Sequence, residues 1–144
     1  MNAIPAVVHA PPRVLIVDDE LHNRQLLEVM LTPEGFLLES VGHTVVAAAS
    51  AELGVALALE CRPDLILMDI QLPGMDGLQA TALLKSNEAT RGIPVIALTA
   101  LAMKGDEARI RAAGCDGYIA KPLAYKDFLA VVREHLVNSG SAIP

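Results

Sequence analysis

The feature that most constrains the fold of this chain is an alternation of short apolar runs with segments of helical spacing. Short runs rich in Val, Ile and Leu predict buried strands, and each is followed by apolar residues at helical spacing. Strands that alternate with helices in this way require right-handed crossovers and a parallel sheet covered on both faces. We therefore expect one α/β domain, a three-layer sandwich. The predicted strands are residues 13–18, 44–48, 64–69, 93–99 and 117–120, and the predicted helices are residues 21–31, 51–60, 76–86, 104–113 and 125–137.

Three segments fall outside this pattern. Residues 1–12 contain three prolines and few apolar anchors, and residues 138–144 are short and mainly polar, which predicts tails on either side of a domain at residues 13–137. Residues 31–42 are surplus to a minimal unit. There, Thr32-Pro33-Glu34 has the pattern of a helix start, and Gly42 has that of a helix stop. Two interpretations stay open: a long kinked first helix, or a short additional helical segment.

Composition excludes several classes of protein. The 144 residues are 53% hydrophobic and 19% charged, which is typical of a globular domain. The net charge of -6 and the absence of a Lys or Arg cluster argue against a nucleic-acid partner. No apolar stretch reaches membrane-spanning length, and the N-terminus lacks the pattern of a secretory signal. With Cys61 and Cys115 as reduced thiols, we expect a soluble, cytoplasmic protein.

Polar side chains gather where the predicted strands end. Ligands of open α/β sheets bind outside the carboxyl ends of the strands, so these residues are expected to converge on one edge. Each alone has an ordinary explanation, since an Asp at a strand end is usually a turn former or a helix N-cap. Their convergence is what indicates a site. The residues are Asp18, Asp19 and Glu20 after the first strand, Asp69 at the third, Thr99 at the fourth and Lys121 after the fifth.

This set of side chains suits phosphoryl transfer. Clustered carboxylates repel one another, and Mg²⁺ is the hard cation expected to join them. Asp69 can attack a phosphoryl group to give an acyl phosphate. Lys121 would neutralise one phosphoryl oxygen, and the Thr99 hydroxyl would donate a hydrogen bond to another. The rest of the catalysis is positioning and electrostatic stabilisation.

Four segments closely resemble the CheY-like receiver domains of bacterial response regulators. They are VLIVDDE, PDLILMDIQLPGMDGL, IPVIALTA and GYIAKPL, and the resemblance covers residues 13–137. The intervals from Asp69 to Thr99 and from Thr99 to Lys121 are those usual for the family. The resemblance implies a flavodoxin-like, doubly wound (βα)5 sheet with strand order 2-1-3-4-5.

The resemblance also implies a metal and phosphorylation site. Asp69 would be the phosphoacceptor. Mg²⁺ would be bound directly by Asp19, through water by Asp18, and by the backbone carbonyl of Gln71 beside Asp69. Lys121 would hold the phosphoryl group.

A conformational switch follows from the same resemblance. Thr99 would move toward the phosphoryl group, and Tyr118 would turn inward behind it. The Lys121-Pro122 peptide bond would be cis, a minority state for prolyl bonds.

One interval departs from the family pattern. The spacing from Asp18 to Asp69 is longer than usual by roughly two helical turns, and the surplus falls around residues 31–38. The apolar residues 36–38 there (FLL) either pack back onto the domain or form an apolar contact patch.

The segment from residue 97 to 123 is most similar to the DivK-like single-domain regulators and to receivers attached to hybrid histidine kinases. No output domain follows the last predicted helix, so we expect a stand-alone response regulator, a monomer or weak dimer without membrane contact. A histidine kinase or histidine phosphotransfer protein would phosphorylate it. It would then dock on a target protein through the fourth helix, fifth strand and fifth helix, near Lys104, Tyr118 and Tyr125. A motor-binding chemotaxis regulator is the nearest rival within the family.

Other functional classes fit less well. The protein would not be an enzyme beyond catalysing its own phosphorylation and dephosphorylation. A phosphohydrolase of the haloacid-dehalogenase type needs a second acid two residues after its aspartyl nucleophile, where this chain has Gln71. A flavodoxin-like cofactor carrier needs stacking aromatics, and the chain has only two Tyr and two Phe. A phosphorylation-independent docking module is the remaining alternative.

Overall fold

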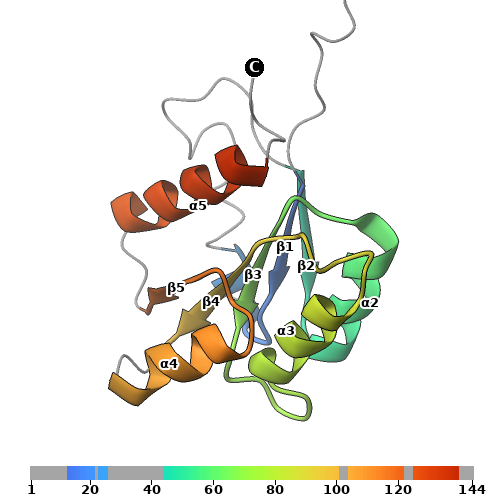
Figure 1. The fold of residues 1–144 in the computed structure, drawn as a ribbon, viewed down its shortest axis with the longest axis horizontal. Coiled ribbons are helices and arrows are strands. Elements are labelled where there is room, and N and C mark those ends of the chain that lie inside the picture. The colour runs from blue at the N-terminus through green and yellow to red at the C-terminus, as the bar shows by residue number, and fades with distance from the viewer. Residues whose placement is uncertain (1–12, 22, 26–43, 101–103, 122–124, 140–144) are drawn as a thin grey trace, which may run out of the picture.

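The computed structural model describes residues 13–21, 23–25, 44–100, 104–121 and 125–139 (Figure 1). Leu21 and residues 23–25 are helical. The other elements, in chain order, are β1 (Arg13–Val17), β2 (Thr44–Ala48), α2 (Ala51–Cys61), β3 (Leu65–Asp69), α3 (Gly77–Ser86), β4 (Val95–Thr99), α4 (Lys104–Ala112), β5 (Gly117–Ala120) and α5 (Tyr125–Ser139).

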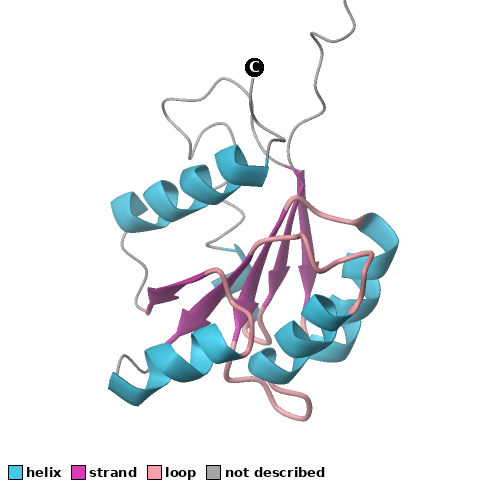
Figure 2. Cartoon of the chain, in the orientation of Figure 1, coloured by secondary structure: helices cyan, strands magenta, loops and turns pink. Residues whose placement is uncertain are grey.

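The five strands form one parallel sheet in the order β2-β1-β3-β4-β5. This confirms the strand order expected of a flavodoxin-like fold. Helices α2, α3 and α4 cover one face of the sheet, and α5 covers the opposite face (Figure 2). The predicted three-layer architecture is therefore confirmed.

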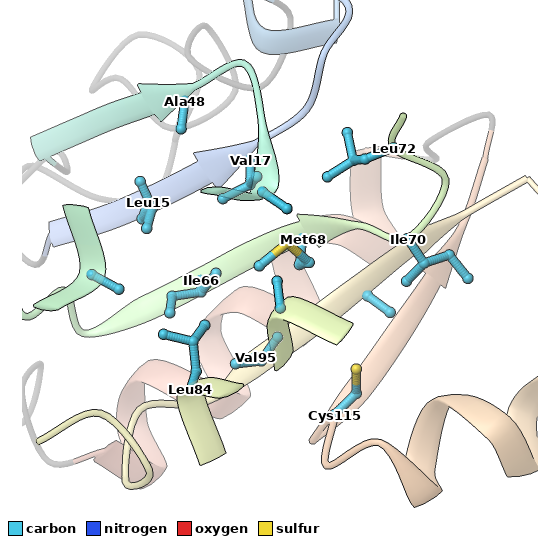
Figure 3. Close-up of a cluster of buried hydrophobic side chains, with 14 of the residues drawn as sticks. Leu15, Val17, Ala48, Ile66, Met68, Ile70, Leu72, Leu84, Val95 and Cys115 are labelled. Atoms are coloured by element: carbon cyan, nitrogen blue, oxygen red, sulfur yellow. The ribbon is translucent and has the colours of Figure 1, made fainter. Parts of the chain in front are cut away.

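The core has two parts because successive side chains of a strand point to opposite faces of the sheet. On β1, Leu15 and Val17 pack in the cluster under α2, α3 and α4, as Figure 3 shows. Val14 and Ile16 pack in the other cluster, together with Phe128 of α5. Strands buried on both faces are apolar throughout, which explains the unbroken apolar runs of the sequence.

The element boundaries differ from the predicted ones where a polar group or proline intervenes. Strand β3 begins after Asp64, because the carboxylate of Asp64 accepts a hydrogen bond from the Arg13 backbone at 2.8 Å. Strand β4 begins after Pro94, which has no N–H to donate. Asp76 is the N-cap of α3 and forms a capping box with Gln79. Ser50 is the N-cap of α2, and its hydroxyl accepts a hydrogen bond from the Leu53 N–H at 3.1 Å.

Several predictions fall outside the described residues. They are the additional helical segment at 31–42, the cis peptide bond to Pro122 and the tail at 1–12. Helix α5 continues to Ser139, two residues past the predicted end. In the part of the chain that the structure describes, no helix is long and apolar enough to cross a membrane.

The two cysteines, both free, lie in different environments. Cys115 is buried, and burial raises the pKa of its thiol, while Cys61 is partly exposed. Because the thiolate is the reactive form, iodoacetamide at about pH 8 is expected to alkylate Cys61 and spare Cys115. Intact mass should therefore show one added group on the native protein and two after unfolding. In Cys61→Ser the native protein should stay unlabelled, and rapid double labelling of the wild type would contradict the burial of Cys115.

Candidate functional site

The predicted site residues lie at the carboxyl edge of the sheet. Asp69 and Thr99 are the last residues of β3 and β4, and Asp18 and Lys121 directly follow β1 and β5. The strands are all parallel, and β1, β3, β4 and β5 are adjacent in the sheet in that order. Their carboxyl ends therefore lie at the same edge. The topology therefore brings together side chains that are far apart along the chain.

Three carboxylates form a cluster at this edge. Asp18, Asp19 and Asp69 each offer an oxygen atom, and these atoms lie within 4.8 Å of one another. Asp18 is 0% exposed and Asp69 is 3% exposed, whereas Asp19 faces solvent. Oxygen ligands of this kind are what a hard divalent cation such as Mg²⁺ requires, so the donor set fits such an ion.

Lys121 joins two of these carboxylates. Its ammonium donates a hydrogen bond to Asp69 Oδ2 at 3.1 Å and lies 3.5 Å from Asp18 Oδ2. The backbone N–H of Lys121 also donates to the Thr99 carbonyl at 2.7 Å. Burial disfavours the charged ammonium, but the hydrogen bond to Asp69 and the two carboxylate charges outweigh it, so the pKa of Lys121 is raised. Lys121 is therefore a fixed positive charge beside Asp69.

Asp69 has a raised pKa, chiefly because burial disfavours its ionised form. The backbone N–H of Gln71, which donates to Asp69 Oδ1 at 2.9 Å, and the Lys121 ammonium both oppose this rise. The charge of Asp18 adds to it. The ionised carboxylate is thus held at a cost in folding free energy, and a cation bound beside it would reduce that cost.

Asp18 is held from several sides, and two of the residues that hold it, Asn23 and Arg24, are not among the site residues predicted from the sequence. Its Oδ1 accepts a hydrogen bond from the Glu20 backbone at 2.9 Å, and its Oδ2 accepts one from Asn23 Nδ2 at 3.4 Å. Arg24 donates to the Asp18 carbonyl at 2.7 Å. Asn23 and Arg24 follow Asp18 by five and six residues and lie in the first helical segment after β1. The sequence signal for them is therefore the polar residues of that segment.

The two predicted switch residues lie on the same face of the sheet. Tyr118 pairs with Ala97 in the β4–β5 ladder, and Thr99 follows Ala97 by two residues, so both side chains point to the α4 side. Thr99 is buried, whereas Tyr118 is partly exposed and its hydroxyl donates to Glu107 Oε1 at 3.4 Å. The hydroxyl of Tyr118 is thus held at the surface by α4 in this structure.

The model of the response regulator receiver domain matches residues 14–133 of this chain. The chain belongs to this family. The polar-differentiation response regulator DivK of Brucella anthropi is 44% identical over 126 residues, which cover 88% of this chain and 97% of that protein. DivK of Brucella abortus is 45% identical over 123 residues, covering 85% and 94% of the two chains. The similarity spans nearly the whole of each DivK protein, as expected for a stand-alone response regulator.

Solved structures agree with this assignment. The receiver domain of a sensor histidine kinase from Pseudomonas aeruginosa, with a magnesium ion coordinated in its active site cleft, has a TM-score of 0.77 and 34% identity. The structural alignment covers 89% of this chain and 99% of that one. A response regulator receiver domain protein, described as CheY-like, from Methanospirillum hungatei has a TM-score of 0.78 and 29% identity, covering 91% and 98%.

Membership of this family settles the class of function. The protein is a response regulator of two-component phosphorelay signalling, and domains of this kind are signalling modules rather than enzymes for free substrates. The haloacid-dehalogenase alternative is not favoured.

Proposed function

We propose that Asp69 accepts a phosphoryl group from a histidine kinase or histidine phosphotransfer protein, in a reaction that requires Mg²⁺. The observation that carries this proposal is the placement of the Lys121 ammonium between Asp69 and Asp18, within the carboxylate cluster. A partly buried ammonium beside a strand-end carboxylate is suited to holding a phosphoryl group once that carboxylate has reacted.

The transfer step follows from the contacts of Asp69. Its Oδ1 accepts the Gln71 N–H and its Oδ2 accepts the Lys121 ammonium, so the carboxylate is fixed in orientation. An oxygen of ionised Asp69 attacks phosphorus, the phosphorus–nitrogen bond to the donor histidine breaks, and its electron pair stays on the imidazole. The product is an aspartyl phosphate. Lys121 then shifts its hydrogen bond from the carboxylate to a phosphoryl oxygen, and Thr99 donates to another.

The residues that would hold Mg²⁺ are the carboxylates of Asp18, Asp19 and Asp69 and the backbone carbonyl of Gln71. When bound, the ion would neutralise charge on the phosphoryl oxygens. The fit of the donor set and the magnesium ion in the Pseudomonas aeruginosa receiver domain support this part of the proposal. Asp69 becomes easier to ionise beside a cation, which suits a nucleophile whose pKa burial has raised.

The proposal is tested by incubating the protein with acetyl phosphate and reading its intact mass. One added phosphoryl group is expected with Mg²⁺, and none after chelation with EDTA. A persistent lack of adduct, together with no binding of beryllofluoride, would instead support a phosphorylation-independent docking module.

Replacing Asp19 should weaken Mg²⁺ binding selectively. Asp19 is the exposed member of the cluster, so Asp19→Asn is expected to leave the fold intact and to reduce Mg²⁺ affinity by more than about tenfold. The measurement is the rise in melting temperature with added Mg²⁺, which reports binding to the native state. Glu20→Gln is the matched control, because Glu20 is an exposed neighbouring acid outside the cluster. An equal loss of Mg²⁺ affinity in both variants would mean that the effect comes from the change in net charge and not from the loss of a metal ligand.

Signalling in this proposal runs from Asp69 to the α4–β5–α5 surface. The phosphoryl group draws Thr99 toward it, and Tyr118 leaves Glu107 and turns inward, which changes the surface offered to a target protein. The hydrogen bond from Tyr118 to Glu107 supports an outward state that can be released. A cytoplasmic location, where a kinase domain can reach Asp69, is part of the proposal.

A further inference from the structure

Exposed apolar side chains concentrate on α2 and α3. Of the four large apolar residues exposed in the described part of the chain, three lie on these helices: Leu53 at 47%, Leu59 at 39% and Leu83 at 47%. Ala56 and Ala82 are exposed on the same two helices. Helices α2 and α3 contact each other and lie side by side on one face of the sheet (Figure 1). We call the surface made by these five residues the α2–α3 face.

The composition of α2 is unusual for a helix on the surface of a domain. Its inner side is built of small residues, Ala51, Gly54 and Ala58, which lie against the sheet. Its outer side carries leucines where a solvated helix normally carries polar residues. Apolar side chains exposed together on two adjacent helices are candidates for an interaction site.

Helix α4 provides the contrast within the same layer. It exposes Glu107, Arg109 and Arg111, and these make ion pairs along the helix, Arg109 with Asp106 at 2.9 Å and Arg111 with Glu107 at 3.5 Å. The charged side chains give α4 an ordinary solvated outer surface. Among the described residues of this layer, the large exposed apolar side chains lie on α2 and α3, whereas α4 exposes only the small apolar residues Ala108 and Ala112 among its charges.

The α2–α3 face also includes an open surface hollow. An open hollow of about 550 Å³ lies beside Leu83, lined by Gly74, Met75, Gln79, Ala82 and Leu83. Gly74 is in the left-handed conformation, with φ of 75°, and the Met75 N–H donates to Glu52 Oε2 at 3.4 Å. The hollow is thus bounded by a loop that α2 holds in place, and it can receive one side chain of a partner.

Within α2 itself, the charged side chains beside the face are acidic. Helix α2 has no Lys or Arg, and its exposed Glu52 and Glu60 lie about 12 Å apart along the helix axis. The one basic residue of α3, Lys85, does not offset them, because its ammonium is held by Asp116 at 2.9 Å and by the Ile93 carbonyl at 2.8 Å. The face therefore combines apolar side chains with the two acids of α2, and the exposed Arg62 follows Glu60 at the C-terminal end of this helix.

We propose that the α2–α3 face binds an amphipathic helix of a partner protein, with apolar residues against Leu53, Leu59 and Leu83 and Lys or Arg residues opposite Glu52 and Glu60. This is the helix-in-groove mode of recognition, with charge selecting the partner. A second copy of the chain is a poorer occupant, since it would bring Glu52 and Glu60 against the same acids.

The test uses a fluorescently labelled peptide built only of leucine and lysine at helical spacing. Fluorescence anisotropy should show saturable binding to the wild type, and a leucine–glutamate peptide of the same apolar pattern should bind at least roughly tenfold more weakly. Leu59→Ser/Leu83→Ser should lose roughly tenfold or more in affinity, although its net charge is unchanged. Leu21→Ser is the matched control, an exposed leucine outside the face, and should bind as the wild type does.

Several outcomes would overturn the proposal. They are no binding of the leucine–lysine peptide, equal binding of the leucine–glutamate peptide, or affinity that the Leu59→Ser/Leu83→Ser change leaves as it was. Sedimentation that shows a concentration-dependent dimer of the wild type, abolished by the same two substitutions, would replace the partner helix with a second copy. Melting temperatures of the variants check that each is folded.

Discussion

A chain with Asn in place of Asp69 is expected to take up no phosphoryl group from acetyl phosphate, whatever the Mg²⁺ concentration. The amide of Asn cannot form an acyl phosphate, while its oxygen can still accept the Gln71 N–H that now bonds to Asp69 Oδ1 at 2.9 Å. Shape and local hydrogen bonding are thus retained and only the nucleophile is removed. Intact mass after incubation measures the result, and the loss should be complete to within the detection of the method.

Two comparisons make the Asp69→Asn result specific. Glu88→Gln, at an exposed carboxylate outside the site, should be phosphorylated as fully as the wild type. Thermal unfolding should show that Asp69→Asn is at least as stable as the wild type at neutral pH. The pKa of Asp69 is raised on folding, so its ionised form opposes folding. This cost begins to fall as the pH drops through the pKa of the folded state and is gone below the pKa of the unfolded state. An adduct that persists in Asp69→Asn would place the phosphorylated residue elsewhere.

The fold and the outline of the site follow from local sequence pattern. The apolar runs that end in Asp18 and Asp69 specify buried parallel strands, and parallel strands place their carboxyl ends on one edge. The cluster of Asp18, Asp19 and Asp69 and the approach of Lys121 follow from that topology alone. The predictions confirmed here, the strands and the residues at their ends, rest on patterns within short stretches of sequence.

Contacts that depend on side-chain packing could not be predicted in the same way. Asp18 and Asp19 are neighbours of the same type in one carboxylate cluster, yet Asp18 is buried and Asp19 is exposed, a difference that residue type does not reveal. The hydrogen bonds that Asn23 and Arg24 donate to Asp18 depend on where the following helix begins. The metal role of Gln71 and the switch roles of Thr99 and Tyr118 came from family resemblance, and they stay predictions.

Gly77 is the first residue of α3 and lies directly against the end of β3. A Cβ at this position would lie 2.2 Å from the carbonyl oxygen of Asp69, 2.7 Å from the Cα of Ile70 and 2.9 Å from the carbonyl carbon of Asp69. All three are backbone atoms at the end of the strand that carries Asp69, the proposed phosphoacceptor, so no side-chain rotation can relieve the contact. The first turn of α3 and the end of β3 approach this closely only because residue 77 has no side chain.

Gly77→Ala is therefore expected to destabilise the protein by about 3 kcal/mol, at the upper end of overpacking costs. Helix propensity alone predicts the opposite sign, since Ala is favoured over Gly within a helix by roughly 1 kcal/mol. Urea denaturation measures the difference, with an unchanged m-value as the sign that the native state is still compact. Phosphorylation of this variant should also slow, because relief of the clash must move either α3 or the backbone of Asp69.

Gly92→Ala is the matched control for this substitution. Gly92 is exposed and a Cβ there would meet nothing within 4 Å, so its effect on the free energy of unfolding should stay within about 1 kcal/mol of either sign. If Gly77→Ala proved as stable as Gly92→Ala, α3 would have to be able to move away from the end of β3 at little cost. The position of Asp69 would then depend on the Gln71 and Lys121 hydrogen bonds rather than on the packing of α3 against the strand.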